Sequence, residues 1–117
     1  MVDQRHKPPH STDAGETLAI DCGLADRAAE GDRAAFEEIY RRYVNRDYGL
    51  SLRLTTDVTE AEILTQDTFV KAWTSLTGYA GRGELGGWLG RIAVNLWRDR
   101  WRSRSRRRQL FDDIVDE

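Results

Sequence analysis

The sequence predicts an all-α fold, a small bundle of three or four helices joined by short connections. Apolar residues recur at spacings of three and four along three long segments, which is the period of an amphipathic helix. Clusters of turn-forming residues separate these segments, and no stretch alternates polar and apolar residues as a half-buried strand does. With 117 residues the chain can form one domain around a modest core.

The first half of the chain contains two predicted helices. A short helix is expected over residues 24–30, and Gly31 ends it. Asp32 then stands where an N-cap residue belongs, and the helix that follows carries an apolar stripe at spacings of three and four. This second helix could bend near Asn45 and resume to about Leu54.

The second half contains two further predicted helices and the loop between them. Asp57, followed three residues later by Glu60, resembles a capping box and begins a helix over residues 57–76. Three glycines within residues 77–84 indicate a loop. The last helix is expected over residues 85–107, because its apolar residues again form one stripe.

The first segment, residues 1–22, lacks periodicity and is predicted to be a disordered leader. Its His6 and His10 have no cysteine or carboxylate partners at ligand spacing, so no metal site is expected. A single cysteine, Cys22, excludes an internal disulfide and favours a reducing compartment. No apolar run resembles a membrane span or a signal peptide, so we expect a cytoplasmic protein without a membrane partner.

Charge is strongly segregated along the chain. The net charge of −2 argues against a nucleic-acid partner by itself. Residues 98–108, however, contain seven arginines and one aspartate, whereas residues 1–97 and residues 109–117 each carry a net charge of −4. Such a chain presents one basic surface while the rest of it stays acidic.

The sequence favours binding over catalysis. It contains no phosphate-binding glycine loop and no nucleophile with an evident base, so we expect neither an enzyme nor a cofactor. Trp97 and Trp101 lie among the arginines, and the glycine-rich loop ahead of them carries Tyr79 and Arg82. Arginines neutralise phosphates, and aromatic rings stack on unpaired bases, with each stacked base contributing roughly 1–3 kcal/mol. The two tryptophans could equally pack against the leader or against a missing partner, and Trp88 is expected in the core.

Four phrases of the sequence resemble region 2 of the extracytoplasmic-function (ECF) sigma factors, which belong to the sigma-70 family. These phrases are residues 32–43, 50–55, 60–73 and 88–95, and they follow one another in a single register. The resemblance implies a region 2 domain over residues 23–108, and residues 109–117 would begin an acidic interdomain linker. The implied fold is the small helical bundle of sigma-70 region 2.

The resemblance also implies a function in transcription initiation. Such a domain docks on the β′ clamp helices of RNA polymerase, then recognises and melts the promoter −10 element by capturing its non-template strand. The residues implied at the polymerase are Glu62, Leu64, Gln66 and Asp67.

The implied DNA contacts come from the loop over residues 76–85 and from the last helix. The loop would hold a base flipped out of the non-template strand, with Tyr79, Arg82 and Glu84 as contacts. Arg91 and Asn95 would lie at the upstream edge of the −10 element, and spacings of three and four place Arg98 and Arg102 on the same helix face.

Two departures from the family pattern affect these expectations. Gly86 and Gly87 stand in the first turn of the last helix, where they should loosen its junction with the loop. The family's C-terminal helix-turn-helix, which reads the −35 element, is not in this sequence, so the chain is either a domain cut at the linker or a natural short form.

Two alternative functions stay open: an interaction module sequestered by an anti-sigma factor, and a general single-stranded nucleic-acid binder. The acidic helix over residues 60–67 disfavours the second.

Overall fold

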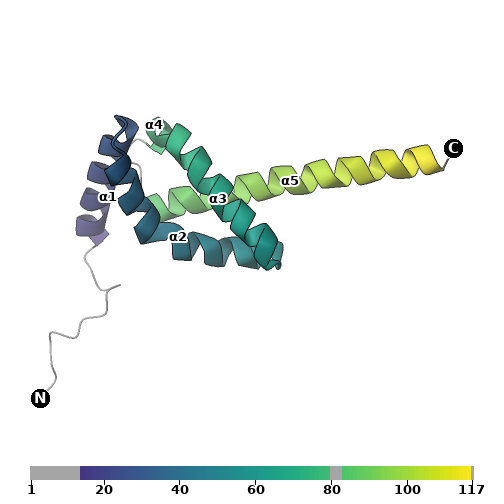
Figure 1. The fold of residues 1–117 in the computed structure, drawn as a ribbon, viewed down its shortest axis with the longest axis horizontal. Coiled ribbons are helices and arrows are strands. Elements are labelled where there is room, and N and C mark those ends of the chain that lie inside the picture. Colours follow the sequence, from purple (N-terminus) through teal and green to yellow (C-terminus); the bar gives the residue numbers. More distant parts are fainter. Residues whose placement is uncertain (1–13, 80–82, 117) are drawn as a thin grey trace, which may run out of the picture.

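A computed structural model describes residues 14–79 and 83–116 of the chain. The described part contains helices and no strand, so the predicted all-α class is confirmed (Figure 1). The helices are α1 (Ala14–Ala29), α2 (Arg33–Thr55), α3 (Val58–Thr74), α4 (Leu76–Tyr79) and α5 (Leu85–Val115). None of the helices in this part is long and apolar enough to cross a membrane.

Helix α1 begins ten residues before the helix that the sequence predicts, so residues 14–22 are not a disordered leader. Its buried positions explain why the apolar pattern is weak there. Asp21 is fully buried and its Oδ2 accepts a hydrogen bond of 2.5 Å from the hydroxyl of Tyr43, while Ala25 and Ala28 fill the next turns. A helix that buries alanines and an aspartate gives little hydrophobic period. His6 and His10 lie outside the described residues.

Both predicted N-caps are confirmed. Asp32 Oδ1 accepts from the backbone N–H of Ala35 at 3.2 Å, and Asp57 Oδ1 accepts from that of Glu60 at 2.8 Å. Each bond satisfies a donor that the first turn of a helix leaves open. The bend considered near Asn45 does not interrupt α2, which is one helix from end to end.

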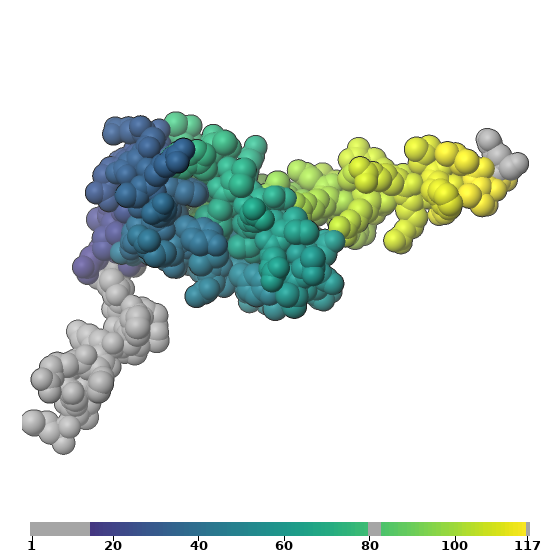
Figure 2. Space-filling view, in the orientation of Figure 1, coloured from purple at the N-terminus to yellow at the C-terminus, as the bar shows by residue number. Residues whose placement is uncertain are grey.

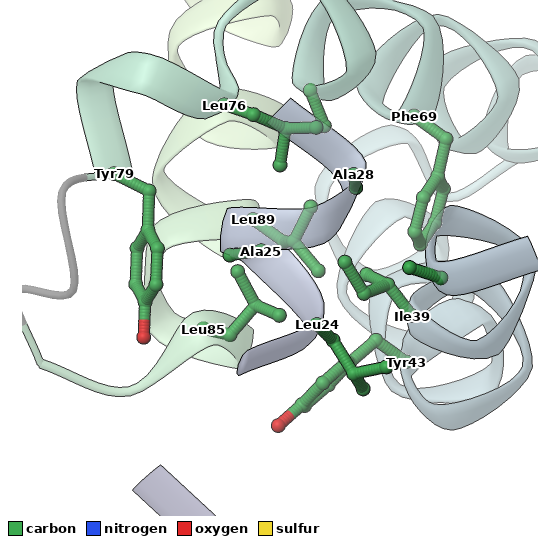
Figure 3. Packing of buried hydrophobic residues seen from close by; sticks show 12 residues of the cluster. Leu24, Ala25, Ala28, Ile39, Tyr43, Phe69, Leu76, Tyr79, Leu85 and Leu89 are labelled. Carbon is green, nitrogen blue, oxygen red and sulfur yellow. The ribbon is translucent and has the colours of Figure 1, made fainter. Parts of the chain in front are cut away.

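The core lies where α2 packs against α1, α3 and α5 (Figure 3). Its apolar side chains come from all five helices, and the main members are Leu24, Ile39, Tyr43, Phe69, Leu76, Tyr79, Leu85 and Leu89. Gly86 permits this packing, since a Cβ there would lie 2.9 Å from Cε1 of Tyr43. The missing side chain at Gly86 thus lets α5 approach α2 closely, and the loosening of the junction stays an expectation.

The last helix extends well beyond the bundle. The sequence predicts that the last helix ends near Arg107 and that residues 109–117 form a linker. In the structure, α5 continues to Val115. Figures 1 and 2 show its second half projecting from the body, and every residue from Arg104 to Asp116 is exposed. The predicted loop over residues 76–85 is also partly helical, since its first four residues form α4.

Candidate nucleic-acid interface

Four polar side chains form a row along the exposed side of α5. Arg91, Asn95, Arg98 and Arg102 lie at offsets of four, three and four, and all four are exposed. Residues at these offsets project from one side of a helix. The predicted shared face is therefore present, and none of its arginines takes part in an ion pair with a described residue.

A hollow of about 270 Å³ lies at the start of this row, between α4 and α5. It brings together three of the predicted DNA contacts, Tyr79 of α4 and Arg91 and Asn95 of α5. Its lining residues are Gly78, Tyr79, Trp88, Arg91, Ile92 and Asn95. The hollow combines apolar walls with a guanidinium and an amide at one side, which suits a flat ring with hydrogen-bonding edges.

Tyr79 is a wall of this hollow and not a free loop side chain. Its residue is only 1% exposed, its ring lies 5.6 Å from that of Trp88, and its hydroxyl donates to the carbonyl oxygen of Gly83 at 2.7 Å. Burial raises the pKa of Tyr79 to about 12, so the hydroxyl stays a donor. The expectation of an exposed ring for stacking is wrong, because α4 turns this side chain into the core. Trp88 packs against that core as predicted.

The two other predicted loop contacts have different outcomes. Arg82 lies outside the described residues. Glu84 is exposed at the N-cap position of α5, where its side chain caps no backbone N–H. Its carboxylate instead forms an ion pair with Arg46 of α2, which ties the start of α5 to the bundle.

The residues predicted to face the polymerase divide into three groups. Glu62 and Gln66 are exposed and line a groove between α2 and α3. Leu64 is 0% exposed, so its predicted place at an interface is wrong: it points into the core. Asp67 is about half exposed and pairs with Arg100 of α5.

The groove between α2 and α3 has a volume of about 770 Å³. Aromatic rings pack edge to face along it, with centroid distances of 5.0 Å for both Phe36–Trp73 and Tyr40–Phe69. Tyr40 and Tyr48 are absent from the predicted site residues. A signal for them exists, because positions 36, 40, 44 and 48 are all apolar or aromatic and form a second stripe beside the buried one. The other lining residues include Arg33, Glu37, Val44, Asn45, Glu62, Thr65, Gln66 and Val70.

Trp97 and Trp101 lie away from the DNA-facing row. Both line a separate hollow of about 270 Å³ with Leu54, Thr55, Glu60, Arg100 and Arg104. Trp97 is half-buried there and Trp101 is 60% exposed. Both tryptophans thus lie against the ends of α2 and α3, a neighbourhood that neither of the alternatives left open for them had named.

Comparisons with known proteins agree with this architecture. The family model Sigma-70 region 2 matches residues 39–107. ECF RNA polymerase sigma factor SigE of Mycolicibacterium smegmatis is 40% identical over 87 residues, which cover 72% of this chain and 34% of that protein. RNA polymerase sigma-H factor of Pseudomonas aeruginosa is 33% identical over 91 residues, which cover 78% of this chain and 47% of that protein. The matches thus span half or less of these relatives.

One solved structure is similar in both fold and sequence. It is the NMR structure of the complex formed by an engineered region 2 of sigmaE in complex with GTAAAA. The two chains align with a TM-score of 0.66 and 29% identity, over 74% of this chain and 90% of the other. Together with the match of the family model over more than half of the residues, this shows that the chain belongs to the sigma-70 region 2 family, among the ECF sigma factors.

Proposed function

We propose that this chain docks on the β′ clamp of RNA polymerase and captures the non-template strand of the promoter −10 element during transcription initiation. One observation carries the DNA half of the proposal: the hollow beside Tyr79 and Trp88 opens directly onto the row of exposed side chains that begins at Arg91 and Asn95. The engineered region 2 of sigmaE, a relative of the same fold, forms a complex with GTAAAA.

The geometry suits the capture of one base and the backbone that follows it. Extruding a base from duplex DNA costs a few kcal/mol of lost stacking and pairing. The hollow would receive the ring, with Arg91 and Asn95 offering hydrogen bonds to its edge, and Arg98 and Arg102 would neutralise phosphates along the strand. Tyr79 holds the wall in shape through its bond to Gly83. Only one strand gains these contacts, so the duplex opens without nucleotide hydrolysis or any catalytic group.

The proposed loop contacts complete this site. In the sequence, Arg82 and Glu84 stand between Tyr79 and Trp88, two residues that line the hollow. Glu84 is exposed. Because Glu84 already pairs with Arg46, a base amino group that binds this carboxylate would share it with an arginine.

The polymerase half of the proposal is supported by the groove between α2 and α3. Its floor is aromatic, and Glu62 and Gln66 offer acceptors at its rim. An amphipathic helix with basic residues would bury its apolar side there and pair its charges with the rim. This groove supports the docking of β′ clamp helices that the family resemblance implies, and a protein that acts with the polymerase would work in the cytoplasm.

Fluorescence anisotropy with labelled single-stranded −10 sequences, varied at each position, tests the DNA half. We expect Arg91→Ala and Asn95→Ala to weaken binding to the strand and to leave binding to a β′ clamp-helix fragment unchanged. Gln66→Ala is the matched control and should do the reverse. Binding with no dependence on base identity would instead favour a general single-strand binder.

A second function, as a module held by an anti-sigma factor, is favoured by the same open groove, since a regulatory helix of similar chemistry would fit it. The two functions are compatible if the regulator competes with the clamp helices. The purified chain should then bind the −10 strand without help, and an anti-sigma partner should displace the clamp-helix fragment.

A further inference from the structure

The arginines of α5 alternate between two sides of the helix. Residues two apart are separated by about 200° around a helix axis, so Arg98 and Arg102 project away from Arg100 and Arg104. The first two are exposed on the proposed DNA-facing row. The second two face α3. The four arginines from Arg98 to Arg104 are therefore two separate groups of charges.

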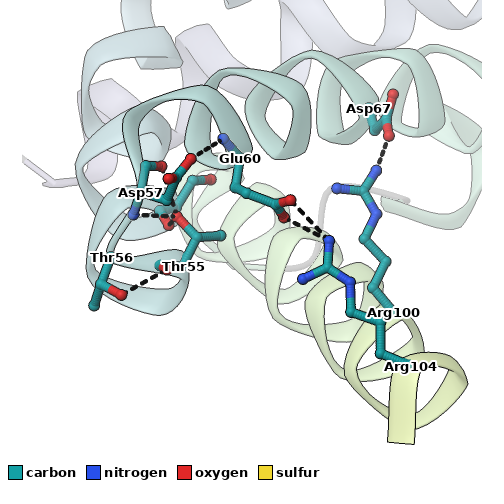
Figure 4. A network of polar contacts seen from close by, with 8 residues as sticks. Thr55, Thr56, Asp57, Glu60, Asp67, Arg100 and Arg104 are labelled. Atoms are coloured by element: carbon teal, nitrogen blue, oxygen red, sulfur yellow. Dashed lines mark hydrogen bonds and ion pairs between the residues drawn. The ribbon is translucent and has the colours of Figure 1, made fainter. Parts of the chain in front are cut away.

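The second group is held by acids of α3 (Figure 4). Nη2 of Arg104 lies 2.8 and 2.9 Å from the two carboxylate oxygens of Glu60. Arg100 forms an ion pair with Asp67, seven residues further along α3. Glu60 does not return its side chain to cap α3, as a full capping box requires, because it points across to α5. We call these two ion pairs the α3–α5 clasp.

The clasp is the last attachment of α5 to the bundle. Beyond Arg104, the ion pairs among the described residues join no part of α5 to another helix, and every side chain is exposed. The hydrogen bond from Gln109 to Asp113 lies within α5 itself. The point at which α5 leaves the body is thus set by Glu60 and Arg104.

The two sides of α5 differ in the charge that a nucleic-acid backbone would meet. On the clasp side, Arg100 and Arg104 are matched by two carboxylates, so a phosphate arriving at this part of the helix would meet no net positive charge from these four groups. On the other side, Arg91, Arg98 and Arg102 have no such partner among the described residues. Along the stretch from Arg91 to Arg104, a nucleic-acid backbone is therefore attracted more strongly to the second of these sides.

We propose that Glu60 and Asp67 are positioning residues for DNA binding, which fix the direction of α5 through Arg104 and Arg100, and that these two arginines contact no phosphate. The clasp would hold the row from Arg91 to Arg102 straight against the bundle, so that the hollow and the phosphate contacts stay in one line. The identity of the ligand in this inference rests on the proposed function.

A salt titration of matched arginine variants tests the assignment. The variants are Arg98→Gln and Arg102→Gln on one side, and Arg100→Gln and Arg104→Gln on the other, and the probe is labelled GTAAAA. Loss of a phosphate contact to a single strand should reduce the log–log salt slope by about 0.7. We expect this reduction for the first pair only. The clasp variants should keep the slope and lose about two- to fivefold in affinity, the size of an exposed ion pair. A slope reduced equally by Arg100→Gln would overturn the assignment.

Charge exchange provides a readout that a purely structural loss would not give. Asp67→Arg combined with Arg100→Asp keeps the net charge and restores the pair in reverse, so affinity should return to within about twofold of the wild type. Glu30→Gln, which changes an exposed acid in the turn after α1 outside the ion pairs described, reports the effect of a change in net charge away from α5. A folded double variant that binds as weakly as the single variants would refute the positioning role.

Unfolding measurements separate the failure of this inference from that of the proposed function. If the wild-type chain binds no single strand, the proposed function fails, but the clasp is still tested by a double-mutant cycle of Asp67→Asn and Arg100→Gln in urea. Non-additive effects on unfolding support the pair, and additive effects overturn it.

Discussion

Asp47 is a buried carboxylic acid in the middle of α2, and its titration should control the stability of the domain. The residue is 4% exposed, and neither carboxylate oxygen has a hydrogen-bond partner within the described part of the chain. Ser51, one turn later in α2, is also fully buried, and its hydroxyl has no hydrogen-bond partner within the described part of the chain either. Burial raises the pKa of Asp47 from 3.8 to about 7, since the charged form is poorly solvated there.

The sign of the pH effect follows from which state holds the proton. Between about pH 4 and pH 7 the folded chain keeps Asp47 protonated, whereas the unfolded chain has released that proton. The free energy of unfolding therefore falls by about 1.4 kcal/mol per pH unit as the pH rises through this window, and levels off above pH 7. Raising the pH from 5 to 8 crosses about two units of the window and should cost about 2–3 kcal/mol, or more than 10 °C in Tm for a domain of this size.

Urea unfolding of the wild type and of Asp47→Asn at pH 5, 6, 7 and 8 measures this effect. The variant cannot ionise, so it should lack this pH-dependent loss, and its difference from the wild type in free energy of unfolding should grow by about 2–3 kcal/mol between pH 5 and pH 8. The pKa of Glu38 is lowered by its hydrogen bond from Arg41, but Glu38 titrates in both proteins and cancels in the difference. Glu30→Gln serves as the control acid and should follow the wild type. Parallel pH profiles for wild type and Asp47→Asn would refute the reasoning.

Four further substitutions test the packing that positions the site, each by urea unfolding. Gly86→Ala should destabilise the domain by about 1–3 kcal/mol, because its Cβ would meet Tyr43. Gly87→Ala has open space around its Cβ and should stabilise α5 by up to about 1 kcal/mol. Equal effects of the two substitutions would contradict the close approach of α5 to α2. Tyr79→Phe loses a buried hydrogen bond and should cost about 1 kcal/mol, and no cost would mean that the hydroxyl does not hold the wall of the hollow. Asp57→Ala removes an N-cap and should cost about 1 kcal/mol, with a neutral result excluding the cap.

Local signals in the sequence predicted most of the fold. The caps at Asp32 and Asp57 depend on a few neighbouring residues, and the apolar stripes of α2, α3 and α5 depend on spacing alone. The first half of α1 was missed because, of the side chains described there, only that of Asp21 is buried, so no apolar stripe marks it. Helix α4 was missed because four residues with a glycine among them resemble a loop.

The sequence predicted those parts of the candidate site that depend on residues close together in the chain. The row from Arg91 to Arg102 follows from helix geometry, so its spacing was sufficient. Leu64 was assigned to an interface by the family resemblance, and Tyr79 because it stood in a predicted loop, but both side chains are buried. The pairing of Asp67 with Arg100 joins residues 33 apart in the chain, and only the packing of α3 on α5 brings them together.

The attachments of α5 explain why a chain with a net negative charge can present a dependable basic surface. At its start, Gly86 lets the helix approach α2 closely and Glu84 is tied to Arg46; further along, Arg104 is tied to α3. These attachments lie about 27 Å apart along the helix axis, at a rise of 1.5 Å per residue. The whole DNA-facing row falls between them, so its geometry is set by the bundle and not by the projecting end. Changes confined to residues 105–116 should therefore leave the alignment of the row with the hollow intact, whereas loss of either attachment should misalign it.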